Sequence, residues 1–306
     1  MAPTRGFPLR TFVSALAVIL ALLLTGFAVP AAWTEHNIVR EDGFVQLTDR
    51  LGKDPAFQAR LAGIAVSNLE AGLDLPAPAG ELGASLLKDA AKHMSSWPEY
   101  PETWNETVRR SHRLNFAGPP APSAGGSAQP GNPASGEASE EASLVLDLGP
   151  FVHLLGEKLR AATGVQLTVP DTAVVGIGGP SQRQVVDRVA AYAPMWWPAA
   201  IGAAMALALA ILAARRRSVV LVCTGIGLAI LAGIWQASAA LIGGVASAGL
   251  GESAMGSLFA RELIASSSDG FAPWVAATAV SGGALFLVGV VGLVLRRKRG
   301  AVAAAG

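Results

Sequence analysis

Four long stretches of this sequence contain no charged residue, and they limit how the chain can fold more than any other feature. They cover residues 11–34, 190–214, 218–251 and 270–295. A helix rises about 1.5 Å per residue, so about 20 apolar residues cross about 30 Å of hydrocarbon. Only 15% of the chain is charged, against about 25% in an ordinary soluble domain. The sequence therefore predicts a mainly α membrane protein with four transmembrane helices.

The basic residues beside these stretches predict an orientation, because cytoplasmic flanks carry an excess of Lys and Arg. Nine of the 23 basic residues lie before the first stretch, between the second and third, or after the fourth. They are Arg5, Arg10, Arg215, Arg216, Arg217, Arg296, Arg297, Lys298 and Arg299. Those segments contain no acidic residue, so we expect both termini in the cytoplasm of a plasma-membrane protein. The other side then holds 14 basic residues against all 22 acidic ones.

The full domain plan follows from the spans and their orientation. We expect, in order, a cytoplasmic N-terminus (1–10), transmembrane helix 1 (11–32), an extracytoplasmic domain (33–193), transmembrane helix 2 (194–214), a cytoplasmic turn (215–218), transmembrane helix 3 (219–242), an extracytoplasmic loop (243–273), transmembrane helix 4 (274–295) and a cytoplasmic tail (296–306). Trp33, Trp196, Trp197, Trp235 and Trp274 lie near the predicted outer ends of spans, where indole rings favour the headgroup boundary.

The first apolar stretch has an alternative interpretation as a cleaved secretory signal, because it has a basic start and ends in small residues. The apolar run from Phe12 to Val29 is long for a signal core. Pro30 also interrupts the small residues that a signal peptidase needs. These two observations favour an uncleaved anchor.

The predicted outer domain divides at residues 118–143, which contain no large apolar side chain. Such a segment cannot bury enough surface to offset its ordering entropy, so we expect a disordered linker. Before the linker, Asp54-Pro55 predicts a helix start. Helical spacing then extends over Phe57, Leu61, Ile64 and Leu69, over Leu82, Leu86, Leu87 and Ala90, and, after a break at residues 96–101, over Trp104, Val108 and His112.

After the linker, short β-type runs alternate with helical ones. Residues 144–148, 165–169 and 173–178 predict strands, and Pro150 opens a predicted helix through residue 162. Ser181 and Gln184 match a capping box that would begin a helix leading into the second span. The expected outcome is a mostly helical α+β extracytoplasmic domain.

Several short motifs resemble a family of uncharacterised actinobacterial multi-pass membrane proteins. The matching residues are Phe44-Val45-Gln46-Leu47-Thr48, Asp54-Pro55-Ala56-Phe57-Gln58, Trp104 with Arg109-Arg110 and His112, and Leu146-Asp147-Leu148-Gly149-Pro150. The resemblance implies an N-terminal anchor, a helical outer domain and C-terminal membrane helices. It implies no activity and transfers no catalytic residue.

No residue pattern predicts a catalytic, cofactor-binding or metal site. The four histidines, His36, His93, His112 and His153, form no HExxH and no pair four residues apart. The glycine-rich run at 174–179 lacks the Lys-Ser/Thr of a P-loop, so we expect a strand–turn–helix connection there. We interpret Glu99, Glu102, Glu106, Glu137, Glu140 and Glu141 as solvated charge, and the single cysteine, Cys223, as a packing residue.

We therefore expect an integral membrane protein of the bacterial cell envelope that has no recognisable catalytic site and serves as an anchored binding, scaffold or sensing protein. The alternatives are a transporter or transporter subunit, or an outer-face enzyme of unrecognised type. Expected partners are the lipid bilayer and another envelope or membrane protein, without nucleic acid. The spans contain no Asp, Glu, Lys, Arg or His, which argues against an ion-coupled transporter.

Small residues at every fourth position predict close helix packing in spans two and three. Span two carries Gly202, Ala206, Ala210 and Ala214, and span three carries Gly225, Ala229, Gly233 and Ala237. Residues four apart share a helix face, and small side chains let helices approach closely in lipid. We expect close helix packing along both stripes, an antiparallel hairpin of spans two and three, and Gly233 at an interface. An alanine-rich composition could also produce such stripes by chance.

Overall fold

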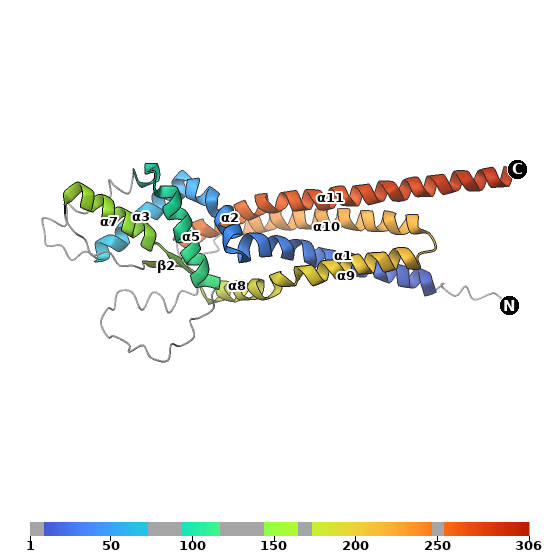
Figure 1. The fold of residues 1–306 in the computed structure, drawn as a ribbon, viewed down its shortest axis with the longest axis horizontal. Coiled ribbons are helices and arrows are strands. Elements are labelled where there is room, and N and C mark those ends of the chain that lie inside the picture. Colours follow the sequence, from blue (N-terminus) through green and yellow to red (C-terminus); the bar gives the residue numbers. More distant parts are fainter. Residues whose placement is uncertain (1–8, 73–92, 117–143, 165–172, 247–253, 306) are drawn as a thin grey trace, which may run out of the picture. The chain divides into compact units, whose positions relative to one another are not determined.

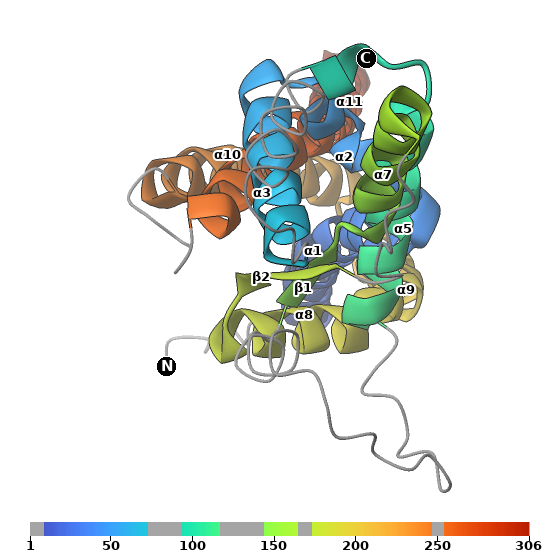
Figure 2. The same cartoon turned by 90° about the vertical axis from the view of Figure 1, so that its left-hand side faces the viewer.

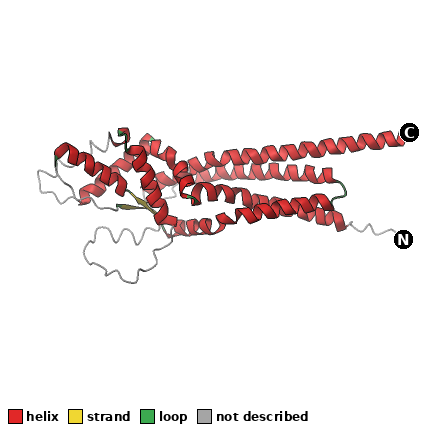
Figure 3. Ribbon diagram, viewed as in Figure 1, coloured by secondary structure: helices red, strands yellow, loops and turns green. Residues whose placement is uncertain are grey.

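The computed structural model describes residues 9–72, 93–116, 144–164, 173–246 and 254–305. The chain separates into two compact units (Figure 1). Unit 1 contains residues 1–35, 192–242 and 268–306, and unit 2 contains residues 36–191 and 243–267. The described chain is predominantly helical (Figure 3), which confirms the mainly α fold class.

Unit 1 is built from four helices that are long and apolar enough to cross a membrane. They are α1 (Leu9–Thr34), α9 (Trp196–Ala213), α10 (Arg217–Ala246) and α11 (Ala254–Ala305), and η3 (Ala193–Met195) precedes α9. The start of α1, the α9–α10 turn and the end of α11 lie at the same end of these helices (Figure 1). Of the flanking arginines, Arg10, Arg215, Arg216, Arg217, Arg296 and Arg297 therefore lie at one end of unit 1.

The segment expected to be an outer loop, residues 243–273, is helical over most of its described residues. Residues 243–246 still belong to α10, and α11 is helical from Ala254 onward. The predicted ends of spans three and four lie where the strongly apolar sequence ends. Charged residues such as Arg261 and Glu262 end the stretch that suits lipid, but they do not break helical hydrogen bonding.

The small residues of α9 lie at a helix interface, as predicted, although their partner is α1. Ala206 and Ala210 are buried, and a side chain at Gly202 would contact Leu24 of α1. The Ser14 hydroxyl of α1 donates a hydrogen bond of 2.9 Å to the Ala210 carbonyl oxygen. The stripe predicts a close neighbour correctly, but it does not identify which helix that neighbour is.

The stripe on α10 is only partly at an interface. A Cβ atom at Gly225 would lie 2.5 Å from the Gly282 carbonyl oxygen and 2.7 Å from the Phe286 backbone nitrogen, both in α11. A Cβ atom at Gly233 would meet nothing within 4 Å, and Ala237 is exposed. The prediction that Gly233 marks the interface is therefore wrong. Four-residue spacing drifts around a helix that has 3.6 residues per turn, so the stripe leaves the α11 contact.

Aromatic side chains gather where α1, α10 and α11 meet in unit 1. The Phe271 ring makes edge contacts with Trp33 at 5.7 Å and with Trp235 at 5.8 Å between ring centroids. Trp33 and Trp235 are two of the tryptophans whose positions suggested an outer membrane boundary. The structure brings them together around one phenylalanine that the sequence did not single out.

Unit 2 is a separate helical domain with a small sheet. Its elements are most of η1 (Glu35–Val39), α2 (Glu41–Lys53), α3 (Pro55–Gly72), η2 (Met94–Ser96), α5 (Tyr100–Phe116), β1 (Leu144–Asp147), α7 (Gly149–Thr163), β2 (Val174–Gly178), α8 (Pro180–Tyr192) and the first part of α11. The two strands pair antiparallel, as they appear in Figure 2. The predicted strand at 165–169, the predicted helix at 82–90 and the linker at 118–143 lie outside the described residues.

Trp104 of α5 lies at the centre of the unit 2 core. Its ring contacts Phe57 of α3 edge-on at 5.3 Å and Phe151 of α7 at 6.5 Å between centroids. Its indole N–H donates a 3.2 Å hydrogen bond to the Thr48 carbonyl oxygen of α2. One side chain therefore joins three helices, and its polar atom is paired, as a buried indole requires.

Two predicted helix starts have different outcomes. The Asp54 carboxylate accepts a 2.7 Å hydrogen bond from the Phe57 backbone N–H, which confirms the N-cap of α3. The expected capping box of Ser181 and Gln184 is wrong by two positions, because α8 already begins at Pro180. The side chain of Gln182 accepts a hydrogen bond from the Gly179 N–H at 3.0 Å and caps the helix instead.

Replacing Gly52 by alanine tests the packing of α2 against Trp104. A Cβ atom at Gly52 would collide with the indole ring, whereas a Cβ atom at Gly63 in α3 meets nothing within 4 Å. We expect Gly52→Ala to lower the free energy of unfolding by about 1–3 kcal/mol through overpacking. Gly63→Ala is the control, and we expect it to be neutral or to stabilise by up to about 1 kcal/mol. Melting temperatures in mild detergent check both, and equal values for the two variants contradict the packing.

Replacing Gly225 by alanine tests the α10–α11 contact in the same way. The added methyl group would meet backbone atoms, which cannot rotate away, so we expect a lower melting temperature in detergent. Gly233→Ala makes the same chemical change in the same helix where space is open, and we expect its melting temperature to be unchanged or higher. A larger loss for Gly233→Ala than for Gly225→Ala contradicts this helix pairing.

Candidate functional site

The structure distributes the four histidines over separate elements. His36 lies in η1, His93 precedes η2, His112 lies in α5 and His153 lies in α7. Within the described ranges, no group of three His, Cys, Asp or Glu side chains is placed to hold a metal ion. Of the four, His112 is the one that is buried, and it is the best candidate for a functional group in unit 2.

His112 is buried and connects α5 to the segment that follows α1. Its Nε2 atom lies 3.0 Å from the Ile38 carbonyl oxygen. A carbonyl only accepts, so Nε2 carries the proton and donates this bond. The imidazole stacks on Phe116 at 4.3 Å with an interplanar angle of 17°, and Phe44 lies 5.2 Å away. The ring is thus held by one hydrogen bond and two aromatic contacts.

The acceptor of this bond belongs to a short π-helix, η1, at Glu35–Val39. π-Helical turns are rare and occur often at functional sites. The next helix, α2, passes so close that a Cβ atom at Gly43 would collide with the His36 carbonyl oxygen. Only glycine allows this approach, so Gly43 and His112 together hold the π-helical segment in place.

Charged side chains surround this histidine on α2 and α5. Glu41 pairs with Arg109 at 3.9 Å and with Arg113 at 3.7 Å. Glu106 pairs with Arg110 at 2.9 Å and with Arg113 at 3.7 Å. These pairs are partly exposed, so each contributes at most about 1 kcal/mol. They form a mixed charge network across α2 and α5, and its Glu41 carboxylate also acts on the His112 imidazole.

Burial lowers the pKa of His112, because a charged imidazolium loses its hydration inside the domain. The Ile38 carbonyl and the Glu41 carboxylate oppose this shift. The lowered pKa keeps the imidazole neutral at neutral pH. His112 is therefore a neutral buried histidine that acid can protonate. The charge that protonation creates is unfavourable inside the domain, so acid destabilises the packing around His112.

The acidic residues singled out in the sequence do not converge. Glu99 accepts a 2.7 Å hydrogen bond from Lys158, and this bond lowers the pKa of the Glu99 carboxyl. Lys158 also lies over the Trp97 ring at 5.5 Å. Glu102 is exposed, and Glu106 belongs to the network around Arg110. Glu137, Glu140 and Glu141 lie outside the described residues.

The glycine-rich run at 174–179 is a strand–turn–helix connection, as predicted. β2 runs antiparallel to β1 and leads through Gly179 into α8. The Gly179 N–H is already bonded to the Gln182 side chain. At least one of the backbone donors at this turn is therefore used within the protein.

Sequence reasoning missed Asp147, which it treated as part of a strand. Its carboxylate is buried and accepts hydrogen bonds from the N–H groups of Gly149 at 2.8 Å and Ala173 at 3.4 Å. Ser111 and Asn115 of α5 hold the same strand through the N–H groups of Asp147 and Val145. An Asp two residues before a Gly-Pro helix start was the available signal.

No family model, curated protein or solved structure matches this chain. Membership of the actinobacterial family that the sequence motifs resemble therefore stays a prediction. Several of its motif residues, including Trp104, His112 and Leu146, do lie buried in unit 2. Their burial explains the residue types without assigning them an activity.

His112→Gln tests the buried histidine through the pH dependence of stability. The folded pKa is lowered from its usual 6.5, so the unfolded chain binds the proton more readily. The histidine therefore stabilises above about pH 6.5, and that stability is lost as pH falls. We expect the melting temperature of the wild type to exceed that of His112→Gln at pH 8, with a gap that narrows toward pH 5.

The matched control is His153→Gln, at a half-buried histidine on α7. The same pH series on this variant gives the baseline for losing a histidine elsewhere in unit 2. A wild-type advantage over His112→Gln that stays constant from pH 8 to pH 5 contradicts the assignment.

Proposed function

We propose that this chain is an integral protein of the bacterial cell envelope that anchors unit 2 outside the cytoplasmic membrane as a binding, scaffold or sensing domain. Both termini lie in the cytoplasm in this proposal. Unit 2 acts by recognising another envelope or membrane component rather than by catalysis.

The observation that carries the proposal is that one helix takes part in two packed groups of side chains. Phe259 of α11 is buried in the core of unit 2, 6.4 Å from Phe57 between ring centroids. Phe271, twelve residues later in the same helix, contacts Trp33 and Trp235 of unit 1. Unit 2 is thereby anchored through a helix of which one part is long and apolar enough to cross a membrane.

The charge distribution supports the proposed side of the membrane. The start of α1, the α9–α10 turn and the end of α11 carry Arg and Lys without acidic residues. Basic residues near the ends of spans favour the cytoplasm. The intervening segments, which carry all 22 acidic residues, are then extracytoplasmic.

Labelling of intact cells tests location and binding together. In a Cys223→Ala background, single cysteines are introduced by Glu102→Cys on α5, Gln184→Cys on α8 and Arg297→Cys on α11. We expect a membrane-impermeant maleimide with a photoreactive group to label positions 102 and 184 on intact cells. Position 297 should react only after lysis, because the membrane shields it.

Illumination should then cross-link at least one of the outer labels to a second molecule, detected as a heavier band and identified by mass spectrometry. Labelling of position 297 from outside overturns the orientation. Full labelling of positions 102 and 184 without any adduct contradicts the binding role while leaving the orientation standing.

A further inference from the structure

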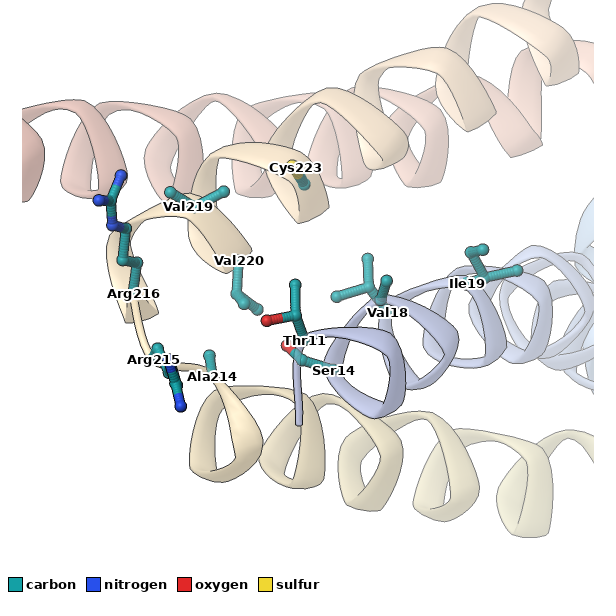
Figure 4. A pocket seen from close by; sticks show the side chains of 11 residues that line it. Thr11, Ser14, Val18, Ile19, Ala214, Arg215, Arg216, Val219, Val220 and Cys223 are labelled. Carbon is teal, nitrogen blue, oxygen red and sulfur yellow. The ribbon is translucent and has the colours of Figure 1, made fainter. Parts of the chain in front are cut away.

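A cavity in unit 1 lies between the first turns of α1, the α9–α10 turn and the start of α10. Its volume is about 570 Å³, within the roughly 300–1,000 Å³ of small-molecule sites. Figure 4 shows side chains from all three segments around it. It lies at the end of the helices that carries Arg215 and Arg216.

The cavity has two chemically different parts. Val18, Ile19, Val219 and Val220 supply aliphatic side chains along its length. Arg215 and Arg216 lie at its end in the turn between α9 and α10 (Figure 4). The Ser14 hydroxyl, which also lines it, is bonded to the Ala210 carbonyl oxygen. The arginines are therefore the main groups available to a polar ligand.

The positive charge at this end has no acidic partner in the described part of the chain. Among the residues that the structure describes, no carboxylate forms an ion pair with Arg215 or Arg216. Every acidic residue of the chain lies between positions 35 and 269, and none lines the cavity. Two exposed guanidinium groups thus stand beside an apolar cavity without neutralisation.

We propose that this cavity binds one phospholipid with an anionic headgroup. Its phosphate contacts the guanidinium groups of Arg215 and Arg216, and one acyl chain lies along Val18, Val219 and Val220. Arginine matches phosphate through paired N–H donors, and basic pockets between membrane helices bind anionic headgroups. The cavity lies at an end of candidate membrane helices, where headgroups meet acyl chains. This inference is independent of the function proposed for unit 2.

The competing explanation is that these arginines only orient the protein in the membrane. In that case they are equivalent to Arg296 and Arg297, which also flank a span but do not line the cavity. Removing two charges from either pair makes the same change in net charge. The two double variants therefore separate a specific lipid site from general attraction to anionic lipid.

Cys223 provides a reporter within the site. It is the only cysteine in the chain, it is exposed, and it lines the cavity. The test measures how fast N-ethylmaleimide modifies Cys223 in the purified full-length protein, in mild detergent with added phosphatidylglycerol or phosphatidylcholine of identical acyl chains. We expect phosphatidylglycerol to slow modification several-fold at a concentration where phosphatidylcholine has little effect.

The charge variants give the decisive comparison. Near a membrane surface each arginine is worth roughly a fivefold change in affinity. We expect Arg215→Gln/Arg216→Gln to need about tenfold or more phosphatidylglycerol for the same protection, and Arg296→Gln/Arg297→Gln to match the wild type. Equal protection by both lipids, or an equal loss in both double variants, overturns the proposal.

A second measurement tests the proposal even if the Arg215→Gln/Arg216→Gln variant does not fold. Arg215→Lys/Arg216→Lys keeps both charges but loses the paired donor geometry, and Ala15→Phe narrows the cavity without changing charge. Native mass spectrometry from detergent should show less retained phosphatidylglycerol for both than for the wild type. If both variants retain as much phosphatidylglycerol as the wild type, the proposal is overturned. Lipid binding would then need neither the arginine geometry nor the cavity.

Discussion

The packing of unit 1 depends on how closely its helices can approach one another. In lipid, the hydrophobic effect does not drive helices together. Lipid chains are as apolar as the side chains they contact, so association relies on dispersion contacts and interhelical hydrogen bonds. Gly225 faces the backbone of α11 at Gly282, and the Ser14 hydroxyl of α1 bonds to the Ala210 carbonyl of α9. Both contacts need small residues on at least one helix, and they determine which helices become neighbours. The aromatic contacts around Phe271 and the cavity beside Arg215 lie along the same packed helices.

Unit 2 is stabilised in a different way, because its core excludes water. Trp104 joins α2, α3 and α7 through ring contacts and one hydrogen bond. The buried polar groups of β1 are satisfied by Ser111 and Asn115 of α5, which avoids the cost of unpaired donors in a core. His112 extends this network to the π-helical segment after α1, and it is the buried group of unit 2 that acid can charge. The site and the core therefore share one helix, α5.

The two proposals concern different parts of the chain and different physical forces. The proposed binding role rests on α11, whose Phe259 packs in unit 2 and whose Phe271 packs in unit 1. The proposed lipid site rests on unneutralised arginines beside an apolar cavity. Each role can fail without the other, because the first concerns recognition by a folded domain and the second concerns headgroup electrostatics at a helix turn.

The sequence by itself determined the four apolar helices, the Asp54 cap and the helical face of Trp104, Val108 and His112. These features depend on local chemistry: span length, capping geometry and side-chain period. The tertiary structure decided the features that depend on distant partners. The small stripe of α9 packs on α1, Gly233 faces open space while Gly225 does not, and His112 meets the carbonyl of Ile38, 74 residues away in sequence. From the sequence, Arg215 and Arg216 are interpreted only as orientation signals. The fold adds that Val18 of α1 lines the same cavity as these two arginines. A periodic pattern shows that a face has a neighbour, but only the packing of all helices together selects which neighbour it is.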